Sequence, residues 1–325
     1  MANDIFVLVE HLDGKVSEIT FELLGTGKDL AAASGGRLVA VLLGSGARGF
    51  ASELGAADQV LSVEHPALAD YTPEAFKRTL GALVQSRGPR VLLVASTAIG
   101  MDQATGLSAD LGWPLVAYAR EVALAGGGLK VVSQIYGGKI LAEVEVKGDH
   151  AIVSVLAGAS PADKGKLAGN PAIEDVAPTA SLDNLRMRFK RLLRPEAGDV
   201  DITKEAVLVS VGRGIGSQDN IPIVQDLADA LGAALSCSRP IVDQGWLAKT
   251  RQVGKSGMNV KPKLYIAIGI SGAPEHLEGM RSAATIVAIN TDSGAPIFDV
   301  AHYGVAADLF DLLPLLTERI RSARA

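Results

Sequence analysis

Four short motifs between Cys237 and Asn290 place glycines, hydroxyl groups or cations where predicted strands end. They read CSRP from Cys237, QVGKSG from Gln252, GISGAPEH from Gly269, and VAIN ending at Asn290. Open α/β sheets bind ligands at the carboxyl ends of their strands. Bare amides and cations there suit phosphate, and hydroxyl groups suit a sugar-like chain or a ring. Four such motifs in series predict a site for one extended ligand.

An earlier motif, VGRGIG at 211–216, follows a predicted strand, and we expect it to open a helix. Its glycines are shifted relative to the G-x-G-x-x-G fingerprint, so a simple tight turn is the alternative. Arg213 adds a cation that a turn does not need. The QVGKSG segment lacks the spacing of a phosphate-binding Walker loop, and its alternative is a β-turn.

Two side chains could act on a flat conjugated ring. Arg239 precedes Pro240, which predicts an extended backbone and a guanidinium held in one direction. His276 follows Pro274 and Glu275 at a predicted helix start, where it could donate to a ring carbonyl. The alternatives are a surface salt bridge for Arg239 and a structural role for His276.

Other polar residues carry weaker signals. Asn290 and Asp292 could bind hydroxyl groups or adenine, or form an Asx-turn. Asp308 is a solvated charge unless a nucleotide reaches it, and the single Cys237 suits core filling. The sequence contains no nucleophile elbow and no metal-ligand spacing. The chain is therefore interpreted as holding a redox cofactor, with no metal and no catalytic residue acting on a substrate.

Composition limits the remaining classes. The chain has 325 residues, 48% of them hydrophobic and only 4% aromatic, with 36 glycines and a net charge of −5. This length suits two domains, and the aliphatic, glycine-rich content favours buried parallel strands. The charge argues against nucleic acid as a partner. One cysteine, no secretory signal and no long apolar run predict a cytoplasmic protein that is not membrane-embedded.

The hydrophobic pattern predicts an α/β protein of two domains. In residues 1–190 we expect strands at 5–10, 38–43, 59–61 and 91–94, helices at 16–34, 50–54, 73–85 and 100–111, and then a β-rich tail with strands at 115–122, 129–134, 139–146 and 151–155. Residues 159–203 are interpreted as a linker containing a basic strand at 185–193, which lies against a partner or, alternatively, binds phosphate or a membrane surface. In 204–325 we expect a doubly wound domain with strands at 206–211, 264–268 and 286–289 and helices at 219–231 and 305–322.

These motifs, together with VLVEHLDG near the start and VSQIYGGKILAEV at Val132–Val144, resemble the alpha subunit of electron transfer flavoprotein over nearly the whole chain. The resemblance implies FAD in the C-terminal domain and a heterodimer with a beta subunit that the N-terminal domain contacts. It implies redox tuning by Arg239 over the ring, by the Ser256 hydroxyl near flavin N5, and by His276 near the ring carbonyl. The implied FAD-binding residues are Arg213, Ser238, Arg239, Gln252, Val253, Gly254, Lys255, Ser256, Gly269, Ser271, Gly272, Ala273, Pro274, Glu275, His276, Asn290 and Asp308.

The chain departs from the family pattern at a few of these positions. Ser256 stands where threonine is frequent, Lys255 where glutamine is common, and Pro274-Glu275 where Ile-Gln is frequent. His302 occupies a position that is often acidic. These departures bear on the redox potential more than on the fold.

The function expected from the resemblance is electron carriage in a bacterial or archaeal cytoplasm. Flavin dehydrogenases, such as the acyl-CoA dehydrogenases of fatty acid β-oxidation, would donate electrons, and a quinone oxidoreductase or another membrane or soluble acceptor would receive them. One alternative is electron bifurcation, with NADH oxidised through a second FAD in the beta subunit. Another is a flavin-free adenine-nucleotide-binding regulatory module.

Overall fold

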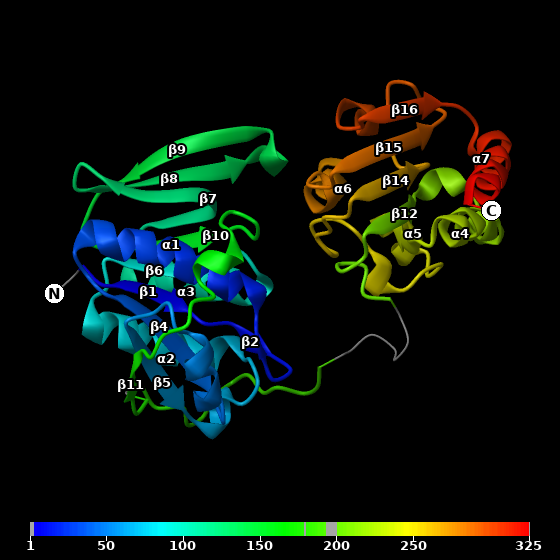
Figure 1. The fold of residues 1–325 in the computed structure, drawn as a ribbon. Helices are drawn as coiled ribbons and strands as arrows, with labels where there is room; N and C mark the ends of the chain where they lie inside the picture. The colour runs from blue at the N-terminus through cyan, green and yellow to red at the C-terminus, as the bar shows by residue number, and fades with distance from the viewer. Residues whose placement is uncertain (1–2, 179, 193–199, 325) are drawn as a thin grey trace. The chain divides into compact units, whose positions relative to one another are not determined.

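The computed structural model describes residues 3–178, 180–192 and 200–324. The chain forms two compact units, Met1–Arg191 and Leu192–Ala325 (Figure 1). Each unit has its own sheet and its own hydrophobic cores.

The N-terminal unit is built on a nine-stranded sheet in the order β11-β5-β4-β1-β6-β10-β7-β8-β9. The sheet is parallel from β11 to β7 and antiparallel from β7 to β9. Its strands are β1 (Ile5–Leu8), β4 (Leu38–Gly44), β5 (Gln59–Glu64), β6 (Val91–Ala95), β7 (Leu115–Ala125), β8 (Gly128–Ile135), β9 (Ile140–Val146), β10 (Ala151–Val155) and β11 (Ala172–Asp175), and its helices are α1 (Glu18–Ser34), α2 (Pro73–Arg87) and α3 (Ala98–Leu111). The small hairpin of β2 (His11–Leu12) and β3 (Lys15–Val16) stands apart from this sheet.

Helices cover both faces of the parallel part, which explains why its central strands β1, β4 and β6 contain no polar side chain. Along β1, Ile5 and Val7 pack into one core, whereas Phe6 and Leu8 pack into the other. The first core includes buried leucines of α1, and the second includes buried residues of α2 and α3. Every residue of β1, β4, β6 and β10 is buried, as expected for strands covered on both faces.

The carboxyl end of β1 is filled by the protein's own side chains. Glu10, two residues beyond the strand, is only 7% exposed. Its carboxylate accepts a hydrogen bond from the Thr97 hydroxyl at 2.7 Å, and Thr97 also caps α3 by accepting from the Gly100 amide at 3.0 Å. Burial raises the pKa of Glu10, and the bonds from Thr97 and Gly100 oppose that rise. The start of α3 is thus occupied by an internal carboxylate.

The interpretation of residues 159–203 as a linker is partly wrong, because the first part of this segment completes the N-terminal unit. Residues 172–175 form β11, which pairs in parallel with β5, and Leu182 is buried in a core. The predicted strand at 185–193 is not formed in its described part, and Leu193 lies outside the described residues. The reason is that the Arg186 and Met187 amides donate to the Glu74 carboxylate instead of to a neighbouring strand.

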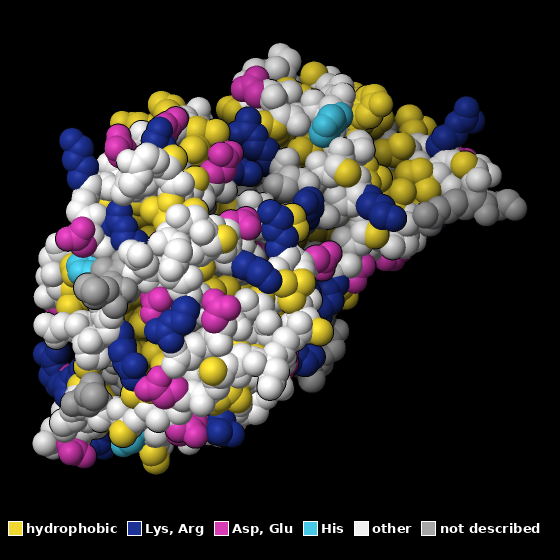
Figure 2. All heavy atoms as spheres, turned by 60° about the vertical axis from the view of Figure 1, so that its left-hand side comes forward, with side chains coloured by type: hydrophobic (Ala, Val, Ile, Leu, Met, Phe, Trp, Pro, Cys, Tyr) yellow, Lys and Arg dark blue, Asp and Glu magenta, His cyan; other side chains and the backbone are white. Residues whose placement is uncertain are grey.

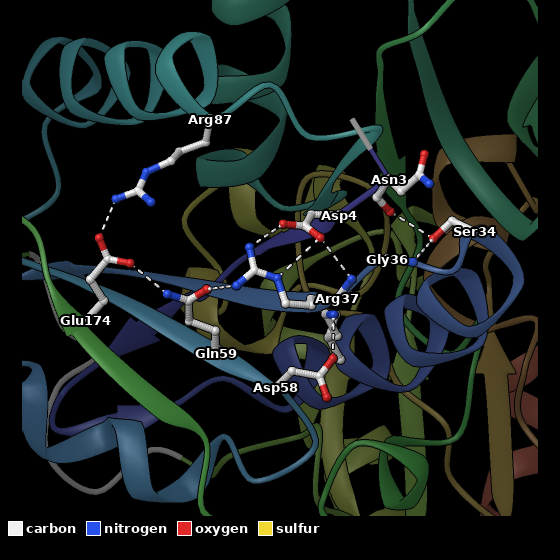
Figure 3. Close-up of polar contacts among 10 residues, drawn as sticks. Asn3, Asp4, Ser34, Gly36, Arg37, Asp58, Gln59, Arg87 and Glu174 are labelled. Carbon is white, nitrogen blue, oxygen red and sulfur yellow. Dashed lines mark hydrogen bonds and ion pairs between the residues drawn. The ribbon is translucent and has the colours of Figure 1, made fainter. Parts of the chain in front are cut away.

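A chain of polar side chains ties β11 to the amino ends of the neighbouring strands (Figure 3). Arg37 donates to the Asp4 carboxylate at 2.7 Å and to the Gln59 side-chain oxygen at 2.8 Å. The Gln59 amide nitrogen donates to the Glu174 carboxylate at 2.7 Å, and Arg87 of α2 forms an ion pair with Glu174. These contacts join β1, β4, β5 and β11, which are distant in sequence.

The C-terminal unit has a fully parallel five-stranded sheet in the order β13-β12-β14-β15-β16. In chain order this is 2-1-3-4-5, the doubly wound arrangement whose switch point lies between the first and third strands, here β12 and β14. The strands are β12 (Val207–Val211), β13 (Ala234–Cys237), β14 (Leu264–Ile268), β15 (Thr285–Asn290) and β16 (Tyr303–Ala306), and the helices are α4 (Ile221–Leu231), α5 (Arg239–Asp243), α6 (Pro274–Met280) and α7 (Leu309–Arg324).

Alternate residues of these strands again enter two cores. One contains Val209 and Val211 with residues of α4 and α7, and the other contains Leu208 and Tyr265 with Met280 of α6. The helix predicted at 305–322 is wrong at its start, because Val305 pairs with Ile289 in β16. The helix α7 begins only at Leu309, and the side chains of Leu309, Leu312, Leu313 and Leu316 pack into the core.

The predicted fold class is confirmed: both units are α/β, one with a β-rich antiparallel tail and one doubly wound.

Lysine and arginine side chains are mixed with aspartate and glutamate over the face drawn in Figure 2. Within the described parts of the chain, no helix has the length and apolar content that crossing a bilayer requires.

Candidate functional site

A cavity of about 730 Å³ lies at the carboxyl ends of the C-terminal unit's strands. Its wall is formed by the loops that follow β12, β13 and β14, by the end of β15, and by the 252–256 segment. This position matches the topological switch point between β12 and β14. The lining residues are Arg213, Gly214, Ser238, Arg239, Pro240, Gln252, Val253, Gly254, Lys255, Ser256, Gly269, Ile270, Ser271, Ala273, Glu275, His276 and Asn290.

Most residues singled out from the sequence lie in this wall. Of the residues assigned to cofactor binding, Gly272, Pro274 and Asp308 are not among the lining residues, whereas all the others are. Gly214, Pro240 and Ile270 line the cavity without having been singled out. Gly214 lies inside the VGRGIG motif, and Pro240 and Ile270 adjoin residues that were selected, so the motifs themselves were the available signal.

Two glycines bring the loops after β12 and β14 into direct backbone contact. The Gly214 amide donates to the Gly269 carbonyl at 2.9 Å, and Gly269 has a positive φ of 62°. A Cβ atom on Gly269 would lie 2.9 Å from the Gly214 Cα, closer than real side chains approach. The expectation that VGRGIG opens a helix is wrong, because a single 3₁₀ turn at Arg213–Ile215 follows β12, and α4 begins at Ile221.

Arg239 reaches the cavity from the first residue of α5. The prediction of an extended Arg239 is wrong: the extended residue is Ser238 (φ −84°, ψ 159°), and Pro240 fits within the first turn of the helix. The Arg239 Nε donates to Asp243 at 3.2 Å, and its side chain is 68% exposed. The salt bridge named as the alternative is therefore present. Because exposed ion pairs contribute little, this pair leaves the guanidinium able to turn toward a ligand.

The loop that carries Ser256 is ordered by a short hydrogen-bond chain. Lys249 Nζ donates to Gln252 Oε1 at 2.9 Å, and Gln252 Nε2 donates to Ser256 Oγ at 2.9 Å. An ammonium group can only donate, which settles the orientation of the buried Gln252 amide. Ser256 accepts from this amide, so its own proton stays available for another acceptor. Sequence reasoning missed Lys249, whose only signal is a cation three residues before Gln252.

His276 lies in α6 and is only 6% exposed. Its Nε2 is 3.0 Å from the phenolic oxygen of the fully buried Tyr265 in β14. Burial lowers the pKa of His276 from 6.5 to about 4, and the backbone of Val253 opposes this fall. At neutral pH the imidazole is therefore uncharged. Sequence reasoning missed Tyr265, because nothing in a buried strand sequence says where its one hydroxyl will meet a partner.

Asn290 and Asp308 have clear local roles. The Asn290 side chain donates to the Ile270 carbonyl at 2.9 Å and accepts from the Asp292 amide at 3.0 Å, so the Asx-turn alternative is present even though Asn290 also lines the cavity. Asp308 accepts from the Phe310 amide at 2.8 Å, at the start of α7.

The charge of the wall favours an anion. Arg213, Arg239 and Lys255 bring three cations, against the single carboxylate of Glu275. Cys237 lies in a core, in agreement with the core-filling interpretation. No cluster of metal-ligating side chains occurs among the residues that the structure describes.

A doubly wound sheet with a cationic, glycine-cradled cavity at its switch point defines a nucleotide- or flavin-binding α/β protein. Comparison with known families makes this specific. Residues 5–181 match the electron transfer flavoprotein domain, and residues 201–281 match the electron transfer flavoprotein FAD-binding domain. The chain belongs to the electron transfer flavoprotein alpha-subunit family, so the resemblance stated from the sequence, the electron-transfer role and the FAD cofactor are confirmed.

Curated relatives match the chain along nearly its whole length. The electron transfer flavoprotein subunit alpha of Syntrophomonas wolfei subsp. wolfei is 37% identical, over 97% of this chain and 98% of that protein. The corresponding subunit of Mycobacterium tuberculosis is 36% identical over 99% of both chains. That of Bacillus subtilis is 33% identical over 99% of this chain and 98% of the relative.

Proposed function

We propose that this chain is the FAD-carrying subunit of a heterodimer with a beta subunit and works as a cytoplasmic electron carrier. It takes electrons from flavin dehydrogenases, including acyl-CoA dehydrogenases, and delivers them to a quinone oxidoreductase or a similar acceptor. The observation that carries the proposal is the cavity at the β12–β14 switch point. FAD, when bound, supplies the one- and two-electron chemistry of its ring system.

The residues present fit this cofactor. A volume of about 730 Å³ is within the range of cofactor sites. The close backbone contact of Gly214 and Gly269 leaves peptide groups uncovered by side chains, and Arg213 and Lys255 supply positive charge for a diphosphate. Ser271 and Asn290 add polar groups suited to hydroxyl groups.

Three side chains are assigned roles toward the ring, following the family resemblance. Arg239 supplies positive charge, Ser256 donates the proton that Gln252 leaves free, and His276 supplies an uncharged imidazole. Fixed donors in a site that excludes water contribute about 3 kcal/mol each to stabilising developing negative charge. Arg239 is the one whose charge is permanent.

The first test is the visible spectrum and the flavin count of the chain purified together with its beta subunit. We expect a yellow complex that releases FAD on denaturation, with poor flavin retention when the chain is produced alone. A colourless complex that binds adenine nucleotides would instead favour the flavin-free regulatory module. The match of residues 201–281 to an FAD-binding domain already speaks against that module.

The second test concerns Arg239. Arg239→Ala should lower the midpoint potential for the first electron, because the permanent positive charge is lost, while FAD stays bound. Reductive titration of the heterodimer measures this. Asp243→Asn is the matched control, since it removes the ion-pair partner and keeps the guanidinium. An unchanged potential in Arg239→Ala would remove Arg239 from the tuning role.

The electron-bifurcating alternative differs in flavin number. It requires a second FAD in the beta subunit and reduction by NADH. A count of two flavins per heterodimer together with reduction by NADH would favour bifurcation, whereas one flavin and no reaction with NADH would favour simple carriage.

A further inference from the structure

Three buried hydroxyl groups lie on the sheet face that packs against α6, among aliphatic side chains. Ser236 of β13 and Ser210 of β12 are register partners, and Tyr265 of β14 lies beside them. The side chains of all three are buried, and Tyr265 ends 3.0 Å from the imidazole of His276. Burying polar groups in a core costs free energy unless they are hydrogen-bonded, so this row requires an explanation.

Tyr265 connects these three hydroxyl groups to one further polar group, the imidazole of His276. Among the described residues, neither Ser210 nor Ser236 makes a close hydrogen bond through its hydroxyl oxygen. Both nevertheless lie near enough to the phenol of Tyr265 to lower its pKa, against the larger effect of burial. Burial raises the pKa of Tyr265, which therefore keeps its proton at every physiological pH. In the part of the chain that the structure describes, His276 Nε2 at 3.0 Å is the one group within hydrogen-bond distance of the phenolic oxygen, so the phenol's proton is directed to that nitrogen.

The second ring nitrogen supports this direction. His276 Nδ1 is buried and has no close hydrogen-bond partner in the described structure. The backbone of Val253 nevertheless favours protonation of the ring, as a nearby carbonyl does. Because an uncharged imidazole carries one proton and Nε2 accepts from the phenol, that proton lies on Nδ1, the nitrogen without a close partner in the described structure.

We propose that Tyr265 is a positioning residue which donates its phenolic proton to His276 Nε2 and so holds the imidazole in the uncharged tautomer protonated at Nδ1. The buried Tyr265, and not the ligand, then determines the orientation of the His276 imidazole at the cavity wall. It follows that His276 adds no positive charge to the cavity wall, whose cations are Arg213, Arg239 and Lys255. The consequence for the ring rests on the proposed function, whereas the tautomer itself does not.

The test is ¹⁵N NMR of the heterodimer with histidine labelled in this chain, which contains five histidines. The signal that disappears in His276→Gln identifies the residue. In the wild-type complex at neutral pH we expect one uncharged tautomer with the proton on Nδ1. Loss of a neutral hydrogen bond of about 1 kcal/mol should reduce that preference roughly five- to tenfold in Tyr265→Phe.

Tyr303→Phe is the matched control, because Tyr303 lies in the same unit and is 68% exposed. It should leave the His276 signal unchanged. The proposal is overturned if the wild-type signal is that of a cation or of the Nε2-protonated form, or if Tyr265→Phe leaves the tautomer ratio as it was.

A second measurement covers the possibility that Tyr265→Phe does not fold. Incorporation of 3-fluorotyrosine makes the phenol a stronger donor while keeping its shape, and it should shift the His276 Nε2 signal toward stronger hydrogen bonding. An unshifted signal would contradict the proposal. If the wild-type complex lacks flavin, the proposed function fails, but the tautomer result still decides the role of Tyr265.

Discussion

The two units of this chain use parallel sheets in opposite ways at their strand ends. In the N-terminal unit, Glu10 follows β1 and its carboxylate bonds to Thr97 at the start of α3, so the protein fills that place itself. In the C-terminal unit, the ends of β12 and β14 meet through Gly214 and Gly269, and a cavity remains. The N-terminal unit fills its strand end with its own carboxylate. The C-terminal unit instead has a cavity at its strand ends that suits the anionic part of a ligand.

A parallel sheet therefore supplies only the location of a site. What makes the location usable is the absence of side chains where peptide groups must approach a ligand, and a surplus of positive charge around them. Both conditions are met in the C-terminal unit, the first by Gly269 and the second by Arg213, Arg239 and Lys255. Three experiments test this difference between the two units.

The largest effect is expected from closing the open site. Gly269→Ala places a Cβ only 2.9 Å from the Gly214 Cα and forces alanine into a positive-φ conformation. Together these should cost roughly 3 kcal/mol, which corresponds to more than a hundredfold loss of FAD affinity in the heterodimer.

Gly216→Ala separates the two causes, because Gly216 also has a positive φ of 80° but its added Cβ would have no neighbour closer than 3.9 Å. FAD content and thermal unfolding of both variants provide the measurement. Equal flavin retention would mean that the close approach of the two loops does not matter for binding.

A second experiment tests the buried imidazole at the open site. The pKa of His276 is depressed from 6.5 to about 4 in the folded state. The unfolded chain therefore takes up a proton first as the pH falls, and stability present above pH 6.5 is lost down to about pH 4. The loss should be at most about 3 kcal/mol.

Denaturant unfolding between pH 7 and 4.5 measures this loss, with His276→Gln as the comparison. The variant should lose less stability than the wild type over this range, since the other titrating groups are common to both. Parallel pH profiles would show that His276 is not buried uncharged.

The smallest effect is expected at the closed strand end. Burial raises the pKa of Glu10, so the stability linked to its protonation is complete below about 4.5 and is lost as the pH rises through the folded-state value. Glu10→Gln keeps an acceptor for Thr97 and removes the buried charge. It should raise the unfolding free energy at pH 7 by about 1 kcal/mol, with the gain vanishing near pH 4. A less stable variant at pH 7 would mean that the ionised carboxylate itself is needed there.

Much of the fold could be predicted because buried parallel strands leave uninterrupted apolar runs, as in β1 and β6. The residues that line the cavity could be predicted because its glycines and cations are grouped in short motifs after such runs. The errors arose where a partner distant in sequence decided the outcome: residues 172–175 found β5, and Val305 found Ile289. Local propensity holds no information about such pairings, nor about the approach of Tyr265 to His276 across two elements.

The pairing of β11 with β5 has a consequence for how the first unit comes into being during translation. Until residues 172–175 have left the ribosome, β5 is the outer strand of its sheet, with an unpaired row of peptide groups on one side. Such an exposed strand edge invites association with other nascent chains. The early half of the polypeptide therefore stays vulnerable until well past the residues that make up most of its sheet.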